Sequence, residues 1–304
     1  MNTYTVTTIE QFRAYGAKEN VPLSELTSFR IGGNAAFVWE VNDYRSLAAV
    51  LAIAEEGGVP VYLLGKGTNI LASDAGYSGL VIRFDRPTHA PVFVGNTVRV
   101  CAGTSLTQLA KETVAQGFMG MERLSGIPGT VGGACAMNAG AYGAEIKQIL
   151  SRVHVLENGT DRWIDVNPDE MGYRKSPFSF PQRIVLEAEL RLLPDDGGAA
   201  ARMQDCTARR REKQPIEYPS AGSVFKRPEG YFAGALIEQC GLKGRQIGGA
   251  QVSEKHAGFI INRGGATEND VSALIAEIQA TVTAERGVRL ECEIKRMGDG
   301  VCIS

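Results

Sequence analysis

The run Ser125-Gly-Ile-Pro-Gly-Thr-Val-Gly-Gly-Ala-Cys-Ala-Met-Asn-Ala-Gly-Ala-Tyr-Gly143 is the most informative part of this sequence. Seven glycines fall within the 24 residues from Gly120 to Gly143, among small and apolar residues rather than charged ones. A solvated linker would be polar, so we expect a tightly packed loop here. Such a loop lets the main chain approach a flat or phosphorylated ligand closely.

A second glycine-rich loop, Leu64-Gly-Lys-Gly-Thr-Asn-Ile-Leu71, follows directly on a strand expected over residues 59–64. Successive main-chain N–H groups in a loop of this kind can form an anion-binding nest. The loop lacks the Gly-Lys-Ser/Thr ending of a P-loop, and Ile70 stands where a Rossmann fingerprint has its third glycine. A plain glycine turn between two strands is the alternative interpretation.

The composition is that of an ordinary globular protein. Of 304 residues, 44% are hydrophobic and 22% charged, and 32 Lys and Arg against 34 Asp and Glu give a net charge of −2. This balance provides no basic field for nucleic acid or an anionic membrane. No apolar run approaches the roughly 18 residues of a membrane span, and no secretory leader is recognisable. We therefore expect a cytoplasmic protein without a nucleic-acid or membrane partner.

The cysteines and histidines form no local metal motif. Six cysteines, at positions 101, 135, 206, 240, 292 and 302, include no C-x-x-C pair, and three histidines form no H-E-x-x-H motif. A dense disulfide framework and the common zinc motifs are thereby excluded, and no metal site is predicted. All six cysteines are expected to be reduced, small and buried.

Hydrophobic spacing predicts an α+β protein in two or three lobes. The first 120 residues are expected to alternate strand and helix, with strands over 59–64, 79–84 and 98–101 and helices over 44–56 and 105–116. Further strands are expected over 152–156, 163–166 and 184–192, the last with Glu187 on its polar side, and a helix over 199–213. The clearest helix spans 268–286, with a capping box at Thr267 and Asp270. A closing strand over 288–297 would turn Cys292 inward.

Four side chains outside the glycine loops could take part in chemistry. Arg174 lies among aromatic and proline residues, where its guanidinium could fork a carboxylate, although a surface arginine in a turn is commoner. Ser223 lies in a proline-bounded loop with basic neighbours, and a solvent loop is an equal alternative. Glu293 is expected by default to be a solvated charge. His256 is expected by default to have a structural role.

The chain resembles the UDP-N-acetylenolpyruvoylglucosamine reductase family from about residue 26 to residue 297. The motifs that carry the resemblance, in the family's order, are Gly65-Lys-Gly-Thr-Asn-Ile-Leu71, Gly126-Ile-Pro-Gly-Thr-Val-Gly-Gly133, Met137-Asn-Ala-Gly-Ala-Tyr-Gly143, Tyr173-Arg-Lys-Ser176, Ala221-Gly-Ser-Val-Phe225 and Gly241-Leu-Lys-Gly244. Each motif alone is weak, but six in order are highly specific. Thr68 and Thr130 stand where the family often has serine, which preserves the hydroxyl.

The resemblance implies an FAD-binding fold of the vanillyl-alcohol-oxidase (PCMH) type, with two α+β subdomains and a third α+β domain for the substrate. The implied boundaries are residues 1–80 with 287–304 for the first subdomain, 81–200 for the second and 201–286 for the substrate-binding domain. Between the strand ending near Leu193 and Lys213 there is room for one helix only, so the chain resembles the shorter form of the family.

The resemblance also implies that FAD is bound by the two glycine loops, with residues 65–69 near its pyrophosphate, and that NADPH reduces it. The implied FAD-binding residues are Gly65, Lys66, Gly67, Thr68, Asn69, Ile70, Gly103, Ser125, Gly126, Ile127, Pro128, Thr130, Gly133 and Asn138. Candidates for holding the UDP moiety of the substrate are Lys213, Lys226, Arg227, His256 and Asn262.

The implied activity is that of a UDP-N-acetylmuramate dehydrogenase in bacterial peptidoglycan synthesis, and hence in cell-wall biogenesis and division. Hydride passes from reduced FAD to C3 of the enolpyruvyl ether, Ser223 protonates C2, and Arg174 stabilises the enolate. Glu293 is expected to orient this set, and the protein to be a monomer or a weak oligomer. Two alternatives are an FAD-dependent oxidase acting on an alcohol or sugar, and a flavin-free module that binds a nucleotide sugar.

Overall fold

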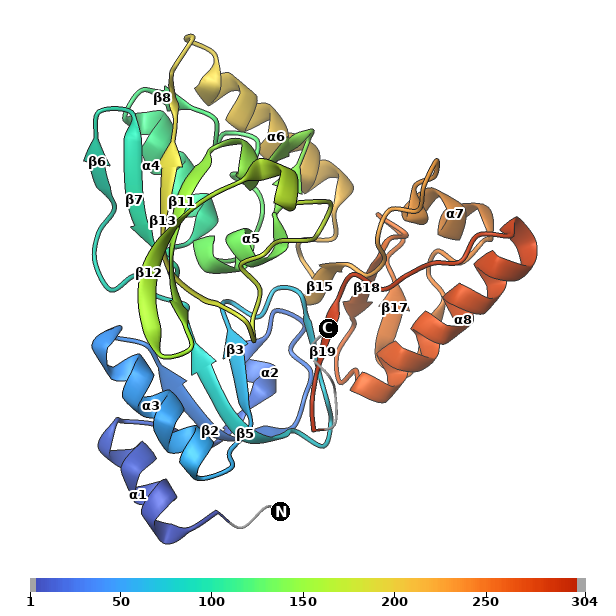
Figure 1. Ribbon diagram of the computed structural model, residues 1–304. Helices are drawn as coiled ribbons and strands as arrows, with labels where there is room; N and C mark the ends of the chain where they lie inside the picture. Colours follow the sequence, from blue (N-terminus) through green and yellow to red (C-terminus); the bar gives the residue numbers. More distant parts are fainter. Residues whose placement is uncertain (1–3, 300–304) are drawn as a thin grey trace.

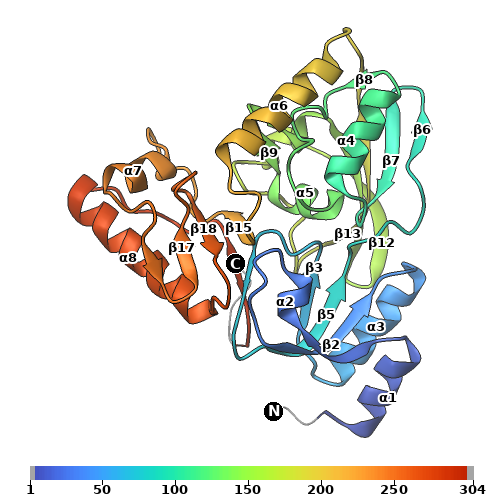
Figure 2. The same ribbon diagram turned by 180° about the vertical axis from the view of Figure 1, so that it is seen from behind.

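Three lobes, each built around its own β-sheet, make up the computed structural model, which describes residues 4–299 (Figure 1). In that view the first lobe lies at the bottom, the second above it and the third to the right. The third lobe meets the other two around β15 and β19 in Figure 1, and Figure 2 shows the same junction at β15 from behind.

The first lobe contains a four-stranded sheet in the order β1-β2-β5-β3, in which β2, β5 and β3 run parallel. Its elements are α1 (Val6–Ala14), β1 (Lys18–Pro22), α2 (Leu23–Leu26), β2 (Asn34–Glu40), α3 (Arg45–Glu56), β3 (Val61–Leu64), β4 (Ile70–Ala72) and β5 (Tyr77–Arg83). Helix α3 follows from its apolar spacing, because Leu47, Val50 and Ala54 all point into the core.

The second lobe contains an antiparallel sheet in the order β12-β11-β13-β7-β6. Its elements are β6 (Val92–Val94), β7 (Thr97–Cys101), α4 (Leu106–Ala115), β8 (Phe118–Met119), α5 (Val131–Met137), β9 (Gly140–Ala141), β10 (Ala144–Glu145), η1 (Ile146–Gln148), β11 (Leu150–Glu157), β12 (Thr160–Asp165), η2 (Pro168–Glu170), β13 (Ile184–Arg191), β14 (Leu193–Pro194) and α6 (Ala199–Lys213). One continuous hydrophobic core joins this lobe to the first, since Phe37 and Leu80 belong to the same cluster as Val100 and Leu190.

The third lobe packs α8 against a small sheet in the order β15-β18-β17-β16. Its elements are β15 (Ser220–Ser223), α7 (Ala233–Gln239), β16 (Gln246–Ile247), β17 (Ala250–Val252), β18 (Phe259–Asn262) and α8 (Glu268–Arg286), and the chain then returns to the first lobe as β19 (Lys295–Met297), parallel to β4. The predicted capping box is confirmed, since Thr267 Oγ1 accepts from Asp270 N and the Asp270 carboxylate accepts from Thr267 N, both at 3.0 Å.

The predicted helices, and the strands up to residue 192, are confirmed to within a few residues, with two corrections to their arrangement. Strand and helix do not alternate through the first 120 residues, because β3 to β7 follow one another without a helix. The expected closing strand over 288–297 is reduced to β19. Residues 291–293, just before β19, form main-chain hydrogen bonds with residues 224–226 instead of with β4. Lys226 N donates to Glu291 O, and Glu293 N donates to Val224 O. The segment therefore changes partner along its length and does not form one continuous strand.

Two predictions of burial were wrong. Cys292 is exposed rather than inward-facing and Cys240 is only partly buried, whereas Cys101, Cys135 and Cys206 are buried as expected. Cys302 lies outside the described residues. Glu187, expected on a polar side of β13, is only 8% exposed. That strand lies in the middle of its sheet, and His89 and Arg99 cover the carboxylate.

Two of the expected domain boundaries fall within elements. Residue 80 lies inside β5, and residue 200 lies at the start of α6. Helix α6 rests on the second lobe in both views, and Arg202 Nε lies 3.0 Å from Glu122 Oε1 there (Figures 1 and 2). Within residues 4–299, no helix combines the length and apolar character needed to cross a membrane.

Candidate active site

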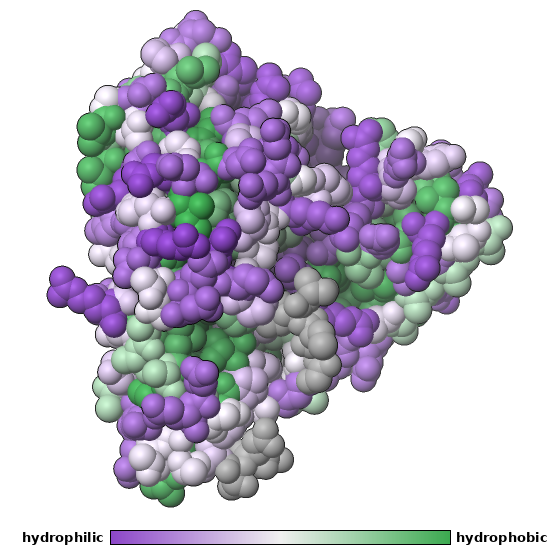
Figure 3. All heavy atoms as spheres, viewed as in Figure 1, coloured by the Kyte–Doolittle hydropathy of each residue, from purple (hydrophilic) through white to green (hydrophobic). Residues whose placement is uncertain are grey.

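A cavity of about 1170 Å³ opens where the three lobes meet. Figure 3 shows mainly hydrophilic residues around the recess between the third lobe and the other two. The volume exceeds the range of about 300–1,000 Å³ usual for small-molecule sites, which suits a dinucleotide together with a second ligand. Both glycine-rich loops line the cavity.

The cavity carries more positive than negative side chains although the whole chain has a net charge of −2. Its charged lining residues are the cations Arg30, Lys66, Arg83, Arg174, Arg183, Arg210 and Lys295 and the acids Glu25, Asp85, Glu217 and Glu293. This excess of cations favours ligands that carry phosphate or carboxylate groups.

The first glycine loop connects β3 to β4 and presents its main chain to the cavity. Gly67 has φ +63°, and a Cβ there would overlap the carbonyl oxygen of Leu26, so only glycine fits. Among residues 4–299, the N–H groups of Lys66, Gly67 and Thr68 have no hydrogen-bond acceptor. Consecutive unpaired N–H groups beside a left-handed residue have the geometry of an anion-binding nest.

The second glycine loop leads into α5 and touches the first. A Cβ on Gly65 would lie 2.7 Å from Thr130 Oγ1, and Thr68 Oγ1 donates to Pro128 O at 3.2 Å. Thr130 also caps α5, since its hydroxyl accepts from Gly133 N at 3.3 Å. The two loops therefore form one surface. Their residues fit a bound FAD because glycines let the main chain approach a ligand closely, because three N–H groups are unpaired and because the cavity is large enough.

Arg174 and Glu293 meet on the cavity wall. Arg174 Nε lies 2.7 Å from Glu293 Oε1, and the Glu293 side chain is 9% exposed. Tyr173 adds a second hydrogen bond, from its hydroxyl to Glu293 Oε2 at 3.3 Å. Arg174 uses only Nε in this pair, so its two Nη groups remain available to a carboxylate in the cavity.

Ser223 is the last residue of β15 and also lines the cavity. Its hydroxyl makes a long hydrogen bond of 3.3 Å to Phe225 O, so it can turn to another partner. The neighbouring His256 lines the cavity too, and burial lowers the pKa of its imidazole, which favours the neutral ring. Its Nδ1 accepts from Gly258 N at 3.1 Å.

Lys295, which sequence reasoning missed, stands two residues beyond Glu293 and lines the cavity. Burial lowers the pKa of its ammonium group, the nearby Lys226 adds to the effect, and no carboxylate acts in the opposite direction. Residues two apart on an extended chain share a face, so Glu293 itself could have pointed to it. Arg210, also missed, reaches the second glycine loop from α6 and donates to Gly126 O.

The structure does not bring all of the predicted site residues to this cavity. Gly65 to Ile70, Gly126, Ile127, Pro128, Thr130, Gly133, Arg174, Ser223, His256 and Glu293 line it, whereas Gly103, Ser125, Asn138, Lys213, Lys226, Arg227 and Asn262 do not.

The buried polar residues of the second group serve the fold. Ser125 donates to Glu122 O at 2.8 Å, and Asn138 donates to Gly172 O at 3.0 Å. Asn262 donates to Phe29 O at 3.1 Å and accepts from Gly264 N at 2.9 Å, so both ends of its amide are engaged.

Two family models match the chain. The FAD binding domain model matches residues 35–165, and the model described as UDP-N-acetylenolpyruvoylglucosamine reductase, C-terminal domain, matches residues 214–297. The first match contains both glycine loops, and the second contains Ser223, Glu293 and Lys295.

Relatives match over nearly the whole chain. UDP-N-acetylenolpyruvoylglucosamine reductase 2 of Symbiobacterium thermophilum is 45% identical over 91% of each chain, and the reductase of Geobacillus thermodenitrificans is 43% identical over 93% of this chain and 94% of its own. The crystal structure of UDP-N-acetylenolpyruvylglucosamine reductase from Thermus caldophilus superposes with a TM-score of 0.77 at 34% identity, covering 91% of this chain and 97% of that one.

Proposed function

Because the chain belongs to the UDP-N-acetylenolpyruvoylglucosamine reductase family, we propose that it reduces UDP-N-acetylglucosamine-enolpyruvate to UDP-N-acetylmuramate with NADPH as reductant. Membership of this family also makes the chain an FAD-binding oxidoreductase of peptidoglycan precursor synthesis. The observation that carries the proposal is the Arg174–Glu293 pair beside Ser223, in one cavity with two glycine loops.

The glycine loops would hold FAD. The unpaired N–H groups of Lys66, Gly67 and Thr68 would bind its pyrophosphate, and the surface of Gly126 to Thr130 would support the rest of the cofactor. When bound, FAD would supply the hydride that reaches C3 of the enolpyruvyl group.

The chain's own residues would handle the charge and the proton. As negative charge develops on C2 and the attached carboxylate, the two Nη groups of Arg174 would fork that carboxylate and stabilise it. Glu293 would act as a positioning residue, because its bond to Nε fixes the plane of the guanidinium. Ser223 would then transfer its hydroxyl proton to C2.

The UDP-sugar would be held mainly by cations. Within residues 4–299 Lys295 pairs with no carboxylate, and it lines the cavity, so it would bind a substrate phosphate or the substrate carboxylate. His256 is the one member of the predicted substrate-binding group that lines the cavity, and it would contact the substrate. Lys226 lies near Lys295, and Arg227 N donates to the Tyr173 hydroxyl, so these two residues would act at the rim of the cavity. Lys213 and Asn262 do not line the cavity and would not contact the substrate.

We also propose a division into three domains close to the expected boundaries. The pairing of β19 with β4 supports placing the C-terminal segment with the first subdomain. Because β5 ends at Arg83 and α6 rests on the second lobe, we move the boundaries to about residue 84 and about residue 214.

A steady-state assay tests the proposed reaction. Purified protein should consume NADPH only when UDP-N-acetylglucosamine-enolpyruvate is present, with one product molecule, heavier by two hydrogens, for each NADPH. Rapid turnover of an alcohol or sugar with oxygen, without need of NADPH, would instead identify an oxidase.

A further inference from the structure

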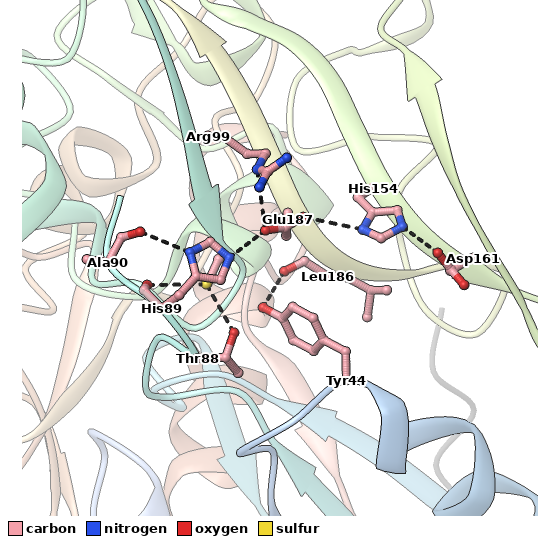
Figure 4. A network of polar contacts seen from close by, with 10 residues as sticks. Tyr44, Thr88, His89, Ala90, Arg99, His154, Asp161, Leu186 and Glu187 are labelled. Atoms are coloured by element: carbon pink, nitrogen blue, oxygen red, sulfur yellow. Dashed lines mark hydrogen bonds and ion pairs between the residues drawn. The ribbon is translucent and has the colours of Figure 1, made fainter. Parts of the chain in front are cut away.

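Outside the cavity, a second cluster of reactive side chains surrounds Glu187 on the sheet of the second lobe (Figure 4). Glu187 on β13 pairs in register with Cys101 on β7 and with His154 on β11, so these three form one row across the sheet. His89 reaches the same carboxylate from the segment between β5 and β6, with Nε2 at 2.6 Å from Glu187 Oε1.

Three of these residues offer ligand atoms to a single point. One ligand atom each from His89, Cys101 and Glu187 lies within 4.8 Å of the other two. A tetrahedral zinc ion with bonds of about 2.0–2.3 Å needs ligand atoms about 3.3–3.8 Å apart. The distances between these ligand atoms, from 2.6 Å to at most 4.8 Å, therefore include the required range. To bind zinc, His89 Nε2 and Glu187 Oε1 would move apart by less than about 1 Å.

The surroundings already orient these ligands. His89 Nδ1 lies 2.9 Å from Ala90 O, which directs Nε2 toward the cluster, as a hydrogen bond behind a metal-bound histidine does. The second oxygen of Glu187 lies 3.5 Å from His154 Nδ1, whose other nitrogen contacts Asp161 Oδ2 at 2.7 Å. Cys101 is fully buried, while the His89 side chain is 39% exposed and leaves a path from solvent.

The charge balance permits a divalent cation. Nδ1 and Nε2 of His89 each lie within hydrogen-bond distance of an oxygen atom, and the Cys101 thiol donates to His89 O. Zn²⁺ would bind Nε2 of the neutral imidazole, the Cys101 thiolate left when the thiol proton is released, and the Glu187 carboxylate, so its two positive charges would meet two negative ligand charges. Arg99 Nε lies 3.8 Å from Glu187 Oε1, and its side chain is half-exposed, so it can turn away from a bound cation.

We propose that His89, Cys101 and Glu187 form a zinc site, with water as the fourth ligand on the exposed side of His89. The set of one thiolate, one imidazole and one carboxylate suits Zn²⁺ better than Mg²⁺ or Ca²⁺, which prefer oxygen ligands. The ion would attach the segment after β5, which carries the cavity residues Phe84 and Asp85, to the second sheet.

Cobalt titration tests the proposal. The metal-free, FAD-loaded protein is titrated with Co²⁺ under reducing conditions, and the cobalt bands at wavelengths beyond the flavin absorption are recorded together with the near-ultraviolet thiolate band. We expect one Co²⁺ per chain and displacement by one equivalent of Zn²⁺. Absence of stoichiometric binding would overturn the proposal.

Variants identify the ligands. Cys101→Ala should abolish the thiolate band, and His89→Gln should weaken binding at least 10-fold; because His89 is half-exposed, that variant tests the site without altering the core. The matched control is Cys292→Ala, which removes the exposed thiol and should leave the titration unchanged. Loss of the thiolate band in Cys292→Ala, or a normal titration in His89→Gln, would contradict the assignment.

Discussion

Arg174 Nε and Glu293 Oε1 lie 2.7 Å apart across the cavity wall, although 119 residues separate them in the chain. The pair joins the second lobe to the segment that returns from the third lobe to the first. Arg174 lines the cavity, and the pair engages only its Nε, which leaves the two Nη groups free to bind a carboxylate.

Replacement of Arg174 should remove stabilisation of the developing enolate. We expect Arg174→Ala to lower kcat by about 100- to 1,000-fold, as loss of one donor to a developing oxyanion typically does. Arg174→Lys keeps the charge but not the fork and should recover only part of this loss. FAD content serves as the control, and near-normal kcat in Arg174→Ala would remove this residue from the mechanism.

Replacement of Glu293 should act through Arg174. Glu293→Gln retains an acceptor for Nε and should lower kcat by about 10-fold, whereas Glu293→Ala leaves the guanidinium unpaired and should cost clearly more. Steady-state kinetics with both variants distinguish the two effects. Equal activity of Glu293→Ala and the unaltered protein would show that Arg174 needs no such support.

Replacement of Ser223 should separate the two halves of the reaction. Ser223→Ala should leave reduction of FAD by NADPH unchanged, because the hydroxyl acts only when C2 is protonated. The rate of product formation should fall by about 100-fold or more, because a positioned general acid typically contributes about 100- to 10,000-fold to the rate. Stopped-flow absorbance measures each half separately, and equal impairment of both would contradict the assignment of Ser223 as proton donor.

Replacement of Gly67 should release FAD. In Gly67→Val the added side chain would overlap Leu26 O and distort the nest, so the purified variant should retain little cofactor. Gly95→Ala is the matched control, since Gly95 also has positive φ but has open space around it. Full FAD occupancy in Gly67→Val, measured from the visible spectrum, would contradict the nest.

Lys295 should make substrate affinity depend on pH. Burial lowers the pKa of its ammonium group, so as pH rises it loses its charge earlier than an ordinary lysine, and KM for the UDP-sugar should rise at alkaline pH. Lys295→Arg should move this rise to higher pH, because a guanidinium stays charged. Lys295→Met should raise KM about 10-fold at neutral pH, and an unchanged KM would show that Lys295 binds no part of the substrate.

Local patterns were enough to predict the helices α3, α4, α6 and α8, six strands (β3, β5, β7, β11, β12 and β13) and the glycine loops, but not α1, α2, α5, α7 or the shorter strands. The stripe in α8 and its capping box depend on neighbours within a few residues, so the sequence shows them directly. The two glycine loops could be recognised because only glycine permits their conformation and close approach, as at Gly65 and Gly67.

Features that depend on pairing between distant segments could not be predicted in this way. The closing strand was overestimated because its alternating pattern does not show that its partner changes from residues 224–226 to β4. Arg210 becomes recognisable as a site residue only once α6 is placed beside the second glycine loop. The cluster of His89, Cys101 and Glu187 matches no local metal motif, because strand register and an intervening segment bring it together.

An anaerobic two-step titration tests the central claim most directly. The purified protein should show the spectrum of oxidised FAD, lose it on addition of NADPH, and recover it when UDP-N-acetylglucosamine-enolpyruvate is added, with UDP-N-acetylmuramate formed in equal amount. A protein that takes up no FAD when it is supplied in excess, or whose reduced flavin persists after the UDP-sugar is added, would contradict the account.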